Sequence, residues 1–438
     1  MGMWQRIVLS GLCLVLLACA SPLAPQATPT LPAAATPLPA SSTPVPSATV
    51  IAATATALPA SAQRPLHLQI INADAMDATP LVQIIERNAA MLGIDVLVSV
   101  RSPDGVYALV QAGLHDETVD AWIGHEYDVT QLQALGAIAQ TPAPPLTVPH
   151  APLFDEAVQP YTAQAVVPLA ARNYLVSIVN TELLASAPVS TADMMSIGSR
   201  QLGRTRYRMA YSWPEGRWFA TMLDSIGATQ TFTDSASILD PDLATIALQS
   251  LTELRTLGPR EATTYVEATT DFIWYRVPYT LDTDVAIRRY EAYSDTLPIS
   301  VAPPPVYTAS GAPFLAPVDV VYGMKSAWMR TDKEADLNRL LAQLQSPSAQ
   351  ADIVTQLRWL PVNTDAAGLL RDDPVWPVLQ SFLGNVRPQR YDAVTICRWD
   401  VYESILPFVL LGDMSVSQGV ESINVRLPQC AQPDGFQP

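Results

Sequence analysis

The chain has 438 residues, with 41 acidic side chains against 25 basic ones and a formal net charge of −16 at pH 7. All acidic residues lie between residues 65 and 438, together with every basic residue except Arg6 and Arg64. An acidic body of this kind argues against binding to nucleic acid and against docking on anionic lipid. The body is long enough to form two lobes rather than one compact core.

An apolar run over residues 7–20 opens the chain and includes the sequence LLAC, which ends at Cys19. The run is shorter than the roughly 20 apolar residues that a membrane-spanning helix needs, and it is organised like a secretory signal. LLAC resembles the lipobox of bacterial lipoproteins, in which the cysteine is acylated and becomes the new N-terminus. This resemblance implies a lipoprotein signal peptide over residues 1–18 and a lipid on Cys19.

Residues 19–64 are rich in Pro, Ala and Thr, and they contain no charged side chain before Arg64. Such a segment has too few large side chains to build a core, so we interpret it as a disordered tether. Signal and tether together predict an exported protein, lipid-anchored to the outer face of the bacterial cell membrane. An unlipidated chain with an unstructured N-terminus would have the same composition.

Two cysteines, Cys397 and Cys430, remain in the body. Cysteines of an exported protein often pair, but the sequence does not show whether their Cα atoms lie within bridging distance. A disulfide and two separate thiols therefore both stay open.

The body alternates strand-like and helix-like segments. Residues 66–74, 94–100 and 119–124 have the pattern of strands, while 80–93, which starts with a proline, and 105–114 have the pattern of helices. Strand and helix in this alternation predict a parallel sheet with right-handed crossovers. Ligands of such sheets bind at the carboxyl ends of the strands, which directs attention to Asp74, Trp122, His125 and Glu126.

The order of segments resembles the extracellular solute-binding proteins of ABC importers, family 1, which includes the maltose-binding protein. The similarity runs through most of the body in collinear order, over residues 120–140, 166–188, 333–363 and 376–420. The last of these ends in the family's Gly-x-x-(Ser/Thr)-Val-x-x-(Gly/Ala) pattern, which starts here at Gly412.

The resemblance implies an α/β fold of two periplasmic-binding-protein-like lobes, joined by crossing strands, with a ligand cleft between the lobes. Lobe one is expected over residues 65–170 and 299–347, and lobe two over residues 171–298 and 348–438. Closure of the lobes around a ligand is the functional motion that such a fold implies.

The resemblance also implies positions for ligand-binding residues. Asp74 follows the first strand, His125 and Glu126 fall on the family's His-Asp loop, and Trp399 stands where the family has a stacking tryptophan. Further candidates lie at the first crossing, in a loop of lobe two and after residue 281; they are Arg172, Asn173, Trp213, Glu215, Trp218, Asp282 and Asp284. Each also has a structural alternative, because tryptophans often pack in cores and acidic residues often cap helices.

We therefore expect a monomeric substrate-binding lipoprotein that delivers a small solute, a carbohydrate other than maltodextrin, to the membrane permease of an ABC importer. A surface sensor of the same fold is an alternative. A glycan-acting enzyme could use Asp282 and Asp284 as its two carboxylates, but the sequence lacks the usual catalytic motifs. No catalytic residue, cofactor or metal is expected, since the histidines at 67, 115, 125 and 150 have no metal-ligand spacing.

Overall fold

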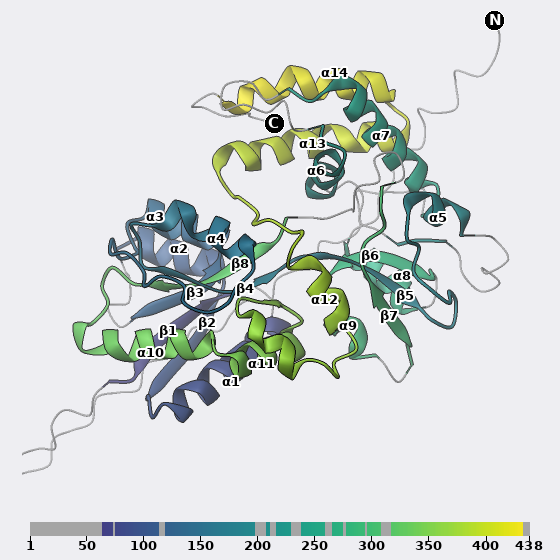
Figure 1. Ribbon diagram of the computed structural model, residues 1–438. Helices are drawn as coiled ribbons and strands as arrows, with labels where there is room; N and C mark the ends of the chain where they lie inside the picture. Colours follow the sequence, from purple (N-terminus) through teal and green to yellow (C-terminus); the bar gives the residue numbers. More distant parts are fainter. Residues whose placement is uncertain are drawn as a thin grey trace, which may run out of the picture. The chain divides into compact units, whose positions relative to one another are not determined.

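The computed structural model describes residues 64–72, 75–113, 119–197, 207–210, 216–228, 238–258, 265–274, 277–293, 296–307 and 317–431, all within one compact unit, residues 63–438 (Figure 1). The signal peptide, Cys19 and the tether predicted from the sequence lie outside these ranges. Within them, no helix is both long enough and apolar enough to cross a lipid bilayer.

A six-stranded mixed sheet has the strand order β2-β1-β3-β8-β4-β9. Its strands are β1 (Leu66–Ile71), β2 (Val96–Arg101), β3 (Ala121–His125), β4 (Val166–Arg172), β8 (Asp319–Lys325) and β9 (Leu360–Pro361). β1 pairs in parallel with β2 and β3, which confirms the arrangement predicted for the first three strands. The remaining neighbours are antiparallel. All six residues of β1 are buried, as a central strand covered on both faces requires.

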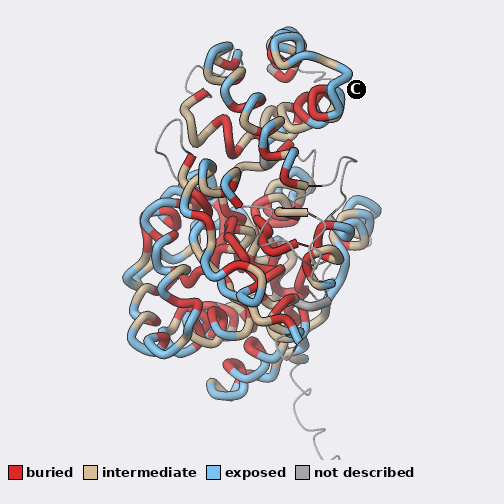
Figure 2. The backbone as a smooth tube through the Cα atoms, turned by 90° about the vertical axis from the view of Figure 1, so that its right-hand side faces the viewer, coloured by how far each residue is buried: buried red, intermediate tan, exposed pale blue. Residues whose placement is uncertain are grey.

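Helices cover both faces of this sheet (Figure 1). One face carries α1 (Ala75–Met91), α10 (Glu334–Leu344) and α11 (Pro347–Leu357), and the other carries α2 (Pro103–Gln111), α3 (Glu126–Ala134) and α4 (Pro152–Val158). Three 3₁₀ helices, η1 (Gln159–Tyr161), η3 (Thr331–Lys333) and η4 (Thr364–Leu369), complete this part. Buried residues gather between these layers, while the outer helix faces are exposed (Figure 2).

α1 begins earlier than the sequence pattern predicts. We expected a helix that starts at Pro80, whereas α1 starts at Ala75 and contains Pro80. A proline inside a helix removes one backbone hydrogen bond. The helix continues through it because Leu81, Ile84 and Ile85 are buried in a core cluster that includes side chains of α10 and α11.

A second, three-stranded antiparallel sheet has the order β6-β5-β7. It consists of β5 (Leu175–Asn180), β6 (Tyr279–Thr283) and β7 (Ile299–Ala302). Four helices lie around it in space: α5 (Thr191–Ser196), α8 (Tyr265–Ile273), α9 (Asp284–Glu291) and α12 (Trp376–Phe382) (Figure 1). Phe272 of α8 and Tyr290 of α9 share a core cluster with Val176 and Ile178 of β5. That cluster also contains side chains of the six-stranded sheet, so one core spans both sheets.

A helical group contains α6 (Gly216–Ser225), α7 (Pro241–Arg255), α13 (Ala393–Leu411), α14 (Val416–Arg426) and the 3₁₀ helix η5 (Leu427–Ala431). α13 packs against α6, α7 and α14. Phe219 of α6, Leu248 of α7, Val409 of α13 and Ile423 of α14 share one core cluster. This cluster also includes Leu175 and Val179 of β5, which ties the helical group to the second sheet.

The chain passes between the two sheets at Asn173. β4 ends at Arg172 and β5 begins at Leu175, in the other sheet. Asn173 has a φ of 60°, a left-handed conformation that asparagine adopts more readily than most residues. Its backbone N–H donates to Asp284 Oδ1 at 2.6 Å, and its side-chain amide donates to Asp319 Oδ2. These two bonds link the crossing to the first turn of α9 and the first residue of β8.

The sheets differ from the expected lobe boundaries at two places. β7 pairs with β5 in the three-stranded sheet, although residues from 299 onward were expected in lobe one. Ile353 and Leu357 of α11 share a core cluster with β1, although residues from 348 onward were expected in lobe two. The division into lobes itself stays a prediction.

The turn between α13 and α14 explains the Gly-x-x-Ser-Val-x-x-Gly pattern. Gly412 ends α13 with a φ of 82°, a conformation that favours glycine. Ser415 caps α14 in a capping box with Gln418. At Gly419 a Cβ atom would lie 2.5 Å from Val409 Cγ2, so only glycine lets the two helices pack this closely.

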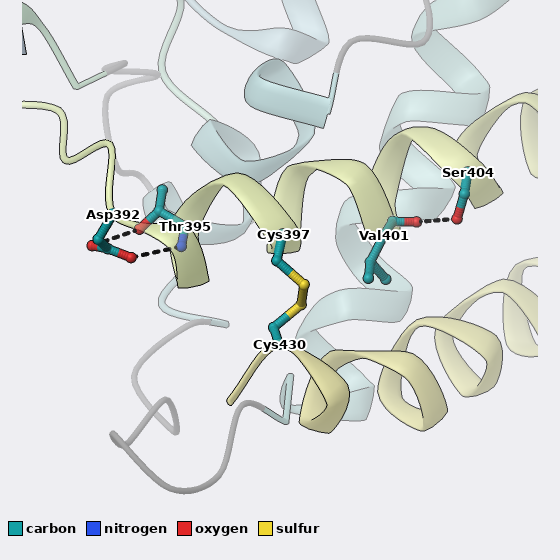
Figure 3. The surroundings of a disulfide bond; sticks show 6 residues. All are labelled: Asp392, Thr395, Cys397, Val401, Ser404 and Cys430. Atoms are coloured by element: carbon teal, nitrogen blue, oxygen red, sulfur yellow. Dashed lines mark hydrogen bonds between the residues drawn. A yellow bond between two sulfur atoms is a disulfide. The ribbon is translucent and has the colours of Figure 1, made fainter. Parts of the chain in front are cut away.

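A disulfide joins Cys397 in α13 to Cys430 in η5, so the pairing that the sequence left open is present (Figure 3). The two residues are 33 apart in sequence, and α14 lies between them. Asp392 caps the start of α13, where its carboxylate accepts the Thr395 N–H at 2.8 Å (Figure 3). Cap and disulfide together fix the first turns of α13.

Replacing both cysteines by serine should lower the free energy of unfolding by about 2–4 kcal/mol, because the unfolded chain then gains the freedom of an open loop. Urea denaturation of the wild type and the double variant measures this difference. Reductant should destabilise the wild type and leave the double variant unchanged. Equal midpoints for the two oxidised proteins would contradict the prediction.

Gly419→Ala should lower the free energy of unfolding by about 1–3 kcal/mol, because the new methyl group collides with Val409. Gly384→Ala is the matched control, since nothing lies within 4 Å of a Cβ atom at that position. Thermal unfolding of the two variants should show a lower Tm for Gly419→Ala alone. A similar Tm for both variants would mean that the α13–α14 contact tolerates a methyl group.

Candidate functional site

The carboxyl end of β3 leads directly into α3, and a buried carboxylate organises this junction. Asp128 is fully buried, accepts the backbone N–H of His125 at 2.8 Å and accepts a hydrogen bond from the Tyr107 hydroxyl. His125 Nε2 lies 3.7 Å from Asp128 Oδ2. Burial raises the pKa of Asp128 above its usual range. Asp128 therefore holds the rings of Tyr107 and His125 at the strand end.

Glu126, a predicted ligand-binding residue, lies next to this junction but is only 3% exposed. Its carboxylate accepts hydrogen bonds from the hydroxyls of Tyr161 at 2.6 Å and Tyr322 at 2.8 Å, and from Arg390 Nη1 at 3.1 Å. Burial and the nearby Glu126 carboxylate raise the pKa of both tyrosines. Glu126 thus ties Arg390, between α12 and α13, to the six-stranded sheet.

A series of five neighbouring rings crosses from the six-stranded sheet to α13, and we call it the aromatic chain. It consists of Tyr107, Tyr127, His125, Tyr391 and Trp399. Neighbouring ring centroids lie 5.5–6.5 Å apart, in edge-on or tilted arrangements. All five residues are only partly buried. The Tyr391 hydroxyl donates to Asp319 Oδ1 at 2.7 Å, which fixes the ring that contacts Tyr127, His125 and Trp399.

A pocket of about 280 Å³ adjoins the α13 end of the aromatic chain. Trp399 and Tyr402 of α13, Thr221 and Asp224 of α6, and the segment 387–390 line it. The segment is fixed against the start of β8, because Val318 N–H donates to the Arg387 carbonyl at 2.9 Å and Gln389 N–H donates to the Val318 carbonyl at 2.8 Å. The pocket walls therefore belong to well-anchored elements.

Arg172 and His125 line a much smaller hollow at the ends of β1 and β3, of about 10 Å³. The Arg172 guanidinium carbon lies 5.5 Å from the ring centroid of Trp359. Trp359 is 2% exposed and therefore packs in the core. A space of this size holds at most one water molecule, so the larger opening of the site lies toward Trp399.

Asp282 and Asp284 do not form the pair of carboxylates that a glycan-acting enzyme would use. Asp282 lies in β6, is 5% exposed and accepts the Thr283 N–H and the Tyr290 hydroxyl. Asp284 is the first residue of α9, is fully buried and accepts the Asn173 N–H. Both carboxylates stabilise the chain itself.

The remaining predicted residues divide into two groups. Trp122 is 2% exposed and packs edge-on against Trp328 in the core, so the prediction that it contacts a ligand is wrong. Asp74, Trp213 and Glu215 lie outside the described residues, as does the side chain of Trp218. In the ranges that the structure describes, no group of three or more His, Cys, Asp or Glu is placed to hold a metal ion.

Sequence reasoning missed Tyr107 and Tyr391, and it missed the arginines at 387, 390 and 398, which line the pocket with Trp399. Tyr391 and these arginines lie within segment 376–420, whose resemblance to the family was the one signal that could have pointed to them. Periodicity gives no hint of Tyr391, because it stands in the non-helical stretch before α13. Its position between His125 and Trp399 becomes evident only in three dimensions.

No protein-family model matches the sequence, and no curated protein does. Several solved structures do match. The GacH receptor of Streptomyces glaucescens, solved unliganded and with acarbose, has a TM-score of 0.67 at 16% identity, over 82% of this chain and 96% of its own. MalX of Streptococcus pneumoniae, in complex with maltopentaose, has a TM-score of 0.66 at 13% identity, over 83% and 99%.

The maltose/maltodextrin-binding domain MalE of Bdellovibrio bacteriovorus, bound to maltotriose, has a TM-score of 0.62 at 16% identity, over 82% of this chain and 98% of its own. These likenesses cover nearly the full length of each binding protein and include both sheets of the present chain. The chain therefore has the two-sheet α/β fold of the periplasmic-binding-protein type that these sugar-binding structures share.

Proposed function

We propose that this chain is the solute-binding component of an ABC importer, and that it captures a saccharide on the aromatic chain and in the adjoining pocket. The observation that carries the proposal is the row of five partly exposed rings, which runs from β3 and α3 to Trp399 of α13. Partly exposed rings in a contiguous row offer apolar faces to the C–H surface of a sugar. Binding proteins of the same fold take maltotriose, maltopentaose and acarbose, which supports this ligand class.

Polar groups beside the rings can bind the hydroxyls of a sugar. The 280 Å³ pocket carries the hydroxyls of Thr221 and Thr395, the amide of Gln389 and several charged side chains. A mixture of ring faces, hydroxyls and charged groups suits a ligand with alternating apolar and polar surfaces. The volume corresponds to a small part of an oligosaccharide, and the rest of the ligand would extend along the aromatic chain.

Capture would work through closure of two lobes about the β4–β5 crossing. A saccharide that touches the β3–α3 side and the α13 side favours the conformation in which both sides reach it. The permease would recognise that closed form. The lipid on Cys19 and the tether would keep the protein at the outer face of the membrane, as a monomer beside the permease. Binding and release, without chemical change of the ligand, complete this function.

Trp399→Ala should weaken saccharide binding by about 2 kcal/mol, or roughly thirtyfold in Kd, because it removes the ring at the pocket end of the aromatic chain. A thermal-shift screen of the purified protein against mono- and oligosaccharides, amino acids, polyols and polyamines finds the ligand. A ligand at 100 times its Kd stabilises the folded state by about 2.7 kcal/mol. Isothermal titration of the wild type and of Trp399→Ala with that ligand then gives the change in Kd.

Trp274→Ala is the matched control for this experiment. Trp274 is 69% exposed, and it takes part in none of the ring contacts of the aromatic chain. Its loss should leave the Kd unchanged. Stabilisation by amino acids or polyamines alone would contradict a saccharide ligand, and equal Kd values for the wild type and Trp399→Ala would contradict the site.

A further inference from the structure

We infer that the pocket beside Trp399 binds a carboxylate of the ligand, and that the ligand is an acidic saccharide that contains uronic acid units. The inference rests on the proposed function and narrows its ligand class. The observation behind it is that three arginines, Arg387, Arg390 and Arg398, line one pocket next to a ring of the aromatic chain. The chain as a whole has a net charge of −16 and only 25 basic residues, so three arginines at one pocket stand out against its composition.

Helix geometry places the groups of this pocket on shared faces. Thr395, Arg398, Trp399 and Tyr402 follow the i, i+3, i+4, i+7 spacing and form one face of α13. The facing helix α6 contributes Ala220, Thr221 and Asp224 in the same way. A guanidinium and an indole ring on one helix face can hold the carboxylate and the ring of a single uronic acid unit.

Arg390 and Arg387 differ in what they already bind. Arg390 donates to the Glu126 carboxylate at 3.1 Å and to the Glu156 carbonyl at 2.6 Å, so its guanidinium group is already bound within the protein. Arg387 is 62% exposed along its side chain and approaches Asp224 at 3.9 Å, which is too long for a hydrogen bond. Among the described residues, the Arg387 guanidinium makes no hydrogen bond. It is therefore available to a ligand carboxylate.

Two acidic residues, Asp224 and Glu156, also line this pocket. Together with Glu126, which binds Arg390, they balance the three arginines, and they suit a ligand with both a carboxylate and free hydroxyls. Carboxylates of the protein accept hydrogen bonds from sugar hydroxyls, whereas guanidinium groups donate two parallel bonds to a planar carboxylate. A ligand with carboxylate groups alone would meet repulsion from Asp224 and Glu156.

The pocket is prepared for such a ligand before it arrives. Arg387 lies in the segment that is hydrogen-bonded through its backbone to Val318, at the start of β8. Arg398 directly follows Cys397, which the disulfide fixes to η5. Binding of the ligand would therefore require little further ordering of the backbone. The smaller entropy cost favours affinity.

Isothermal titration with three trisaccharides tests the inference: a triuronate, the same trisaccharide with its carboxyl groups reduced to alcohols, and a phosphorylated neutral trisaccharide. The triuronate should bind at least about tenfold more tightly than its reduced counterpart, as charge-assisted hydrogen bonds predict. In the variants Arg387→Gln and Arg398→Gln this preference should fall below about threefold. Because the Arg387 side chain is exposed, the Arg387→Gln variant should fold like the wild type. An unchanged Tm verifies this.

Arg339→Gln is the matched control. Arg339 is 55% exposed on α10, pairs with Asp336 at 3.5 Å, and does not line the pocket. This variant should keep the full preference for the triuronate. Tighter binding of the reduced trisaccharide would overturn the inference and leave the proposed function intact. Tighter binding of the phosphorylated one would overturn the carboxylate assignment, and no binding of any saccharide would overturn the inference and the proposed function together.

Discussion

The buried carboxylate of Asp319 is the point on which the rest of the structure depends. It is 1% exposed and stands at the first residue of β8. One of its oxygens accepts the side-chain amide of Asn173, at the crossing between the two sheets, and the other accepts the hydroxyl of Tyr391, in the middle of the aromatic chain. A single side chain therefore couples the path of the backbone to the position of the rings. Removing one partner of a buried charged group leaves the other unsatisfied, so each of these contacts supports the others.

Buried acids play the same part elsewhere in the molecule. Glu126 joins two tyrosines to Arg390, Asp128 joins β3 to α3, and Asp284 holds the backbone of Asn173. Glu126 and Asp284 were expected to contact a ligand. They are buried instead, and the buried acids of this region accept hydrogen bonds from the side chains and backbone around them. The pocket beside the rings combines aromatic residues, three arginines and two acidic residues.

Part of this organisation was predictable from the sequence. Apolar runs such as that of β1 are buried on both faces, and the pattern from Gly412 to Gly419 contains its own physical explanation, a helix end followed by a cap and a close contact. The family resemblance pointed to Trp399, which lies at one end of the aromatic chain. Trp122 and Trp274 show where the sequence pattern misleads. Trp122, in a strand that leads to the expected site, is buried, whereas Trp274, whose neighbours in the sequence are apolar, is exposed. Contacts such as that of Tyr391 with His125 join residues more than 260 positions apart, and no local pattern reports them.

A crystal structure of the protein grown with the oligosaccharide that stabilises it most would show whether the aromatic chain holds the ligand. We expect a sugar ring within about 4 Å of the Trp399 indole, with further units along Tyr391 toward His125. The apolar hollow lined by Pro144, Pro145 and Leu146, at the start of β4, offers a larger volume of about 340 Å³ but no charged group. A saccharide bound there, with the aromatic chain left uncovered, would contradict the account.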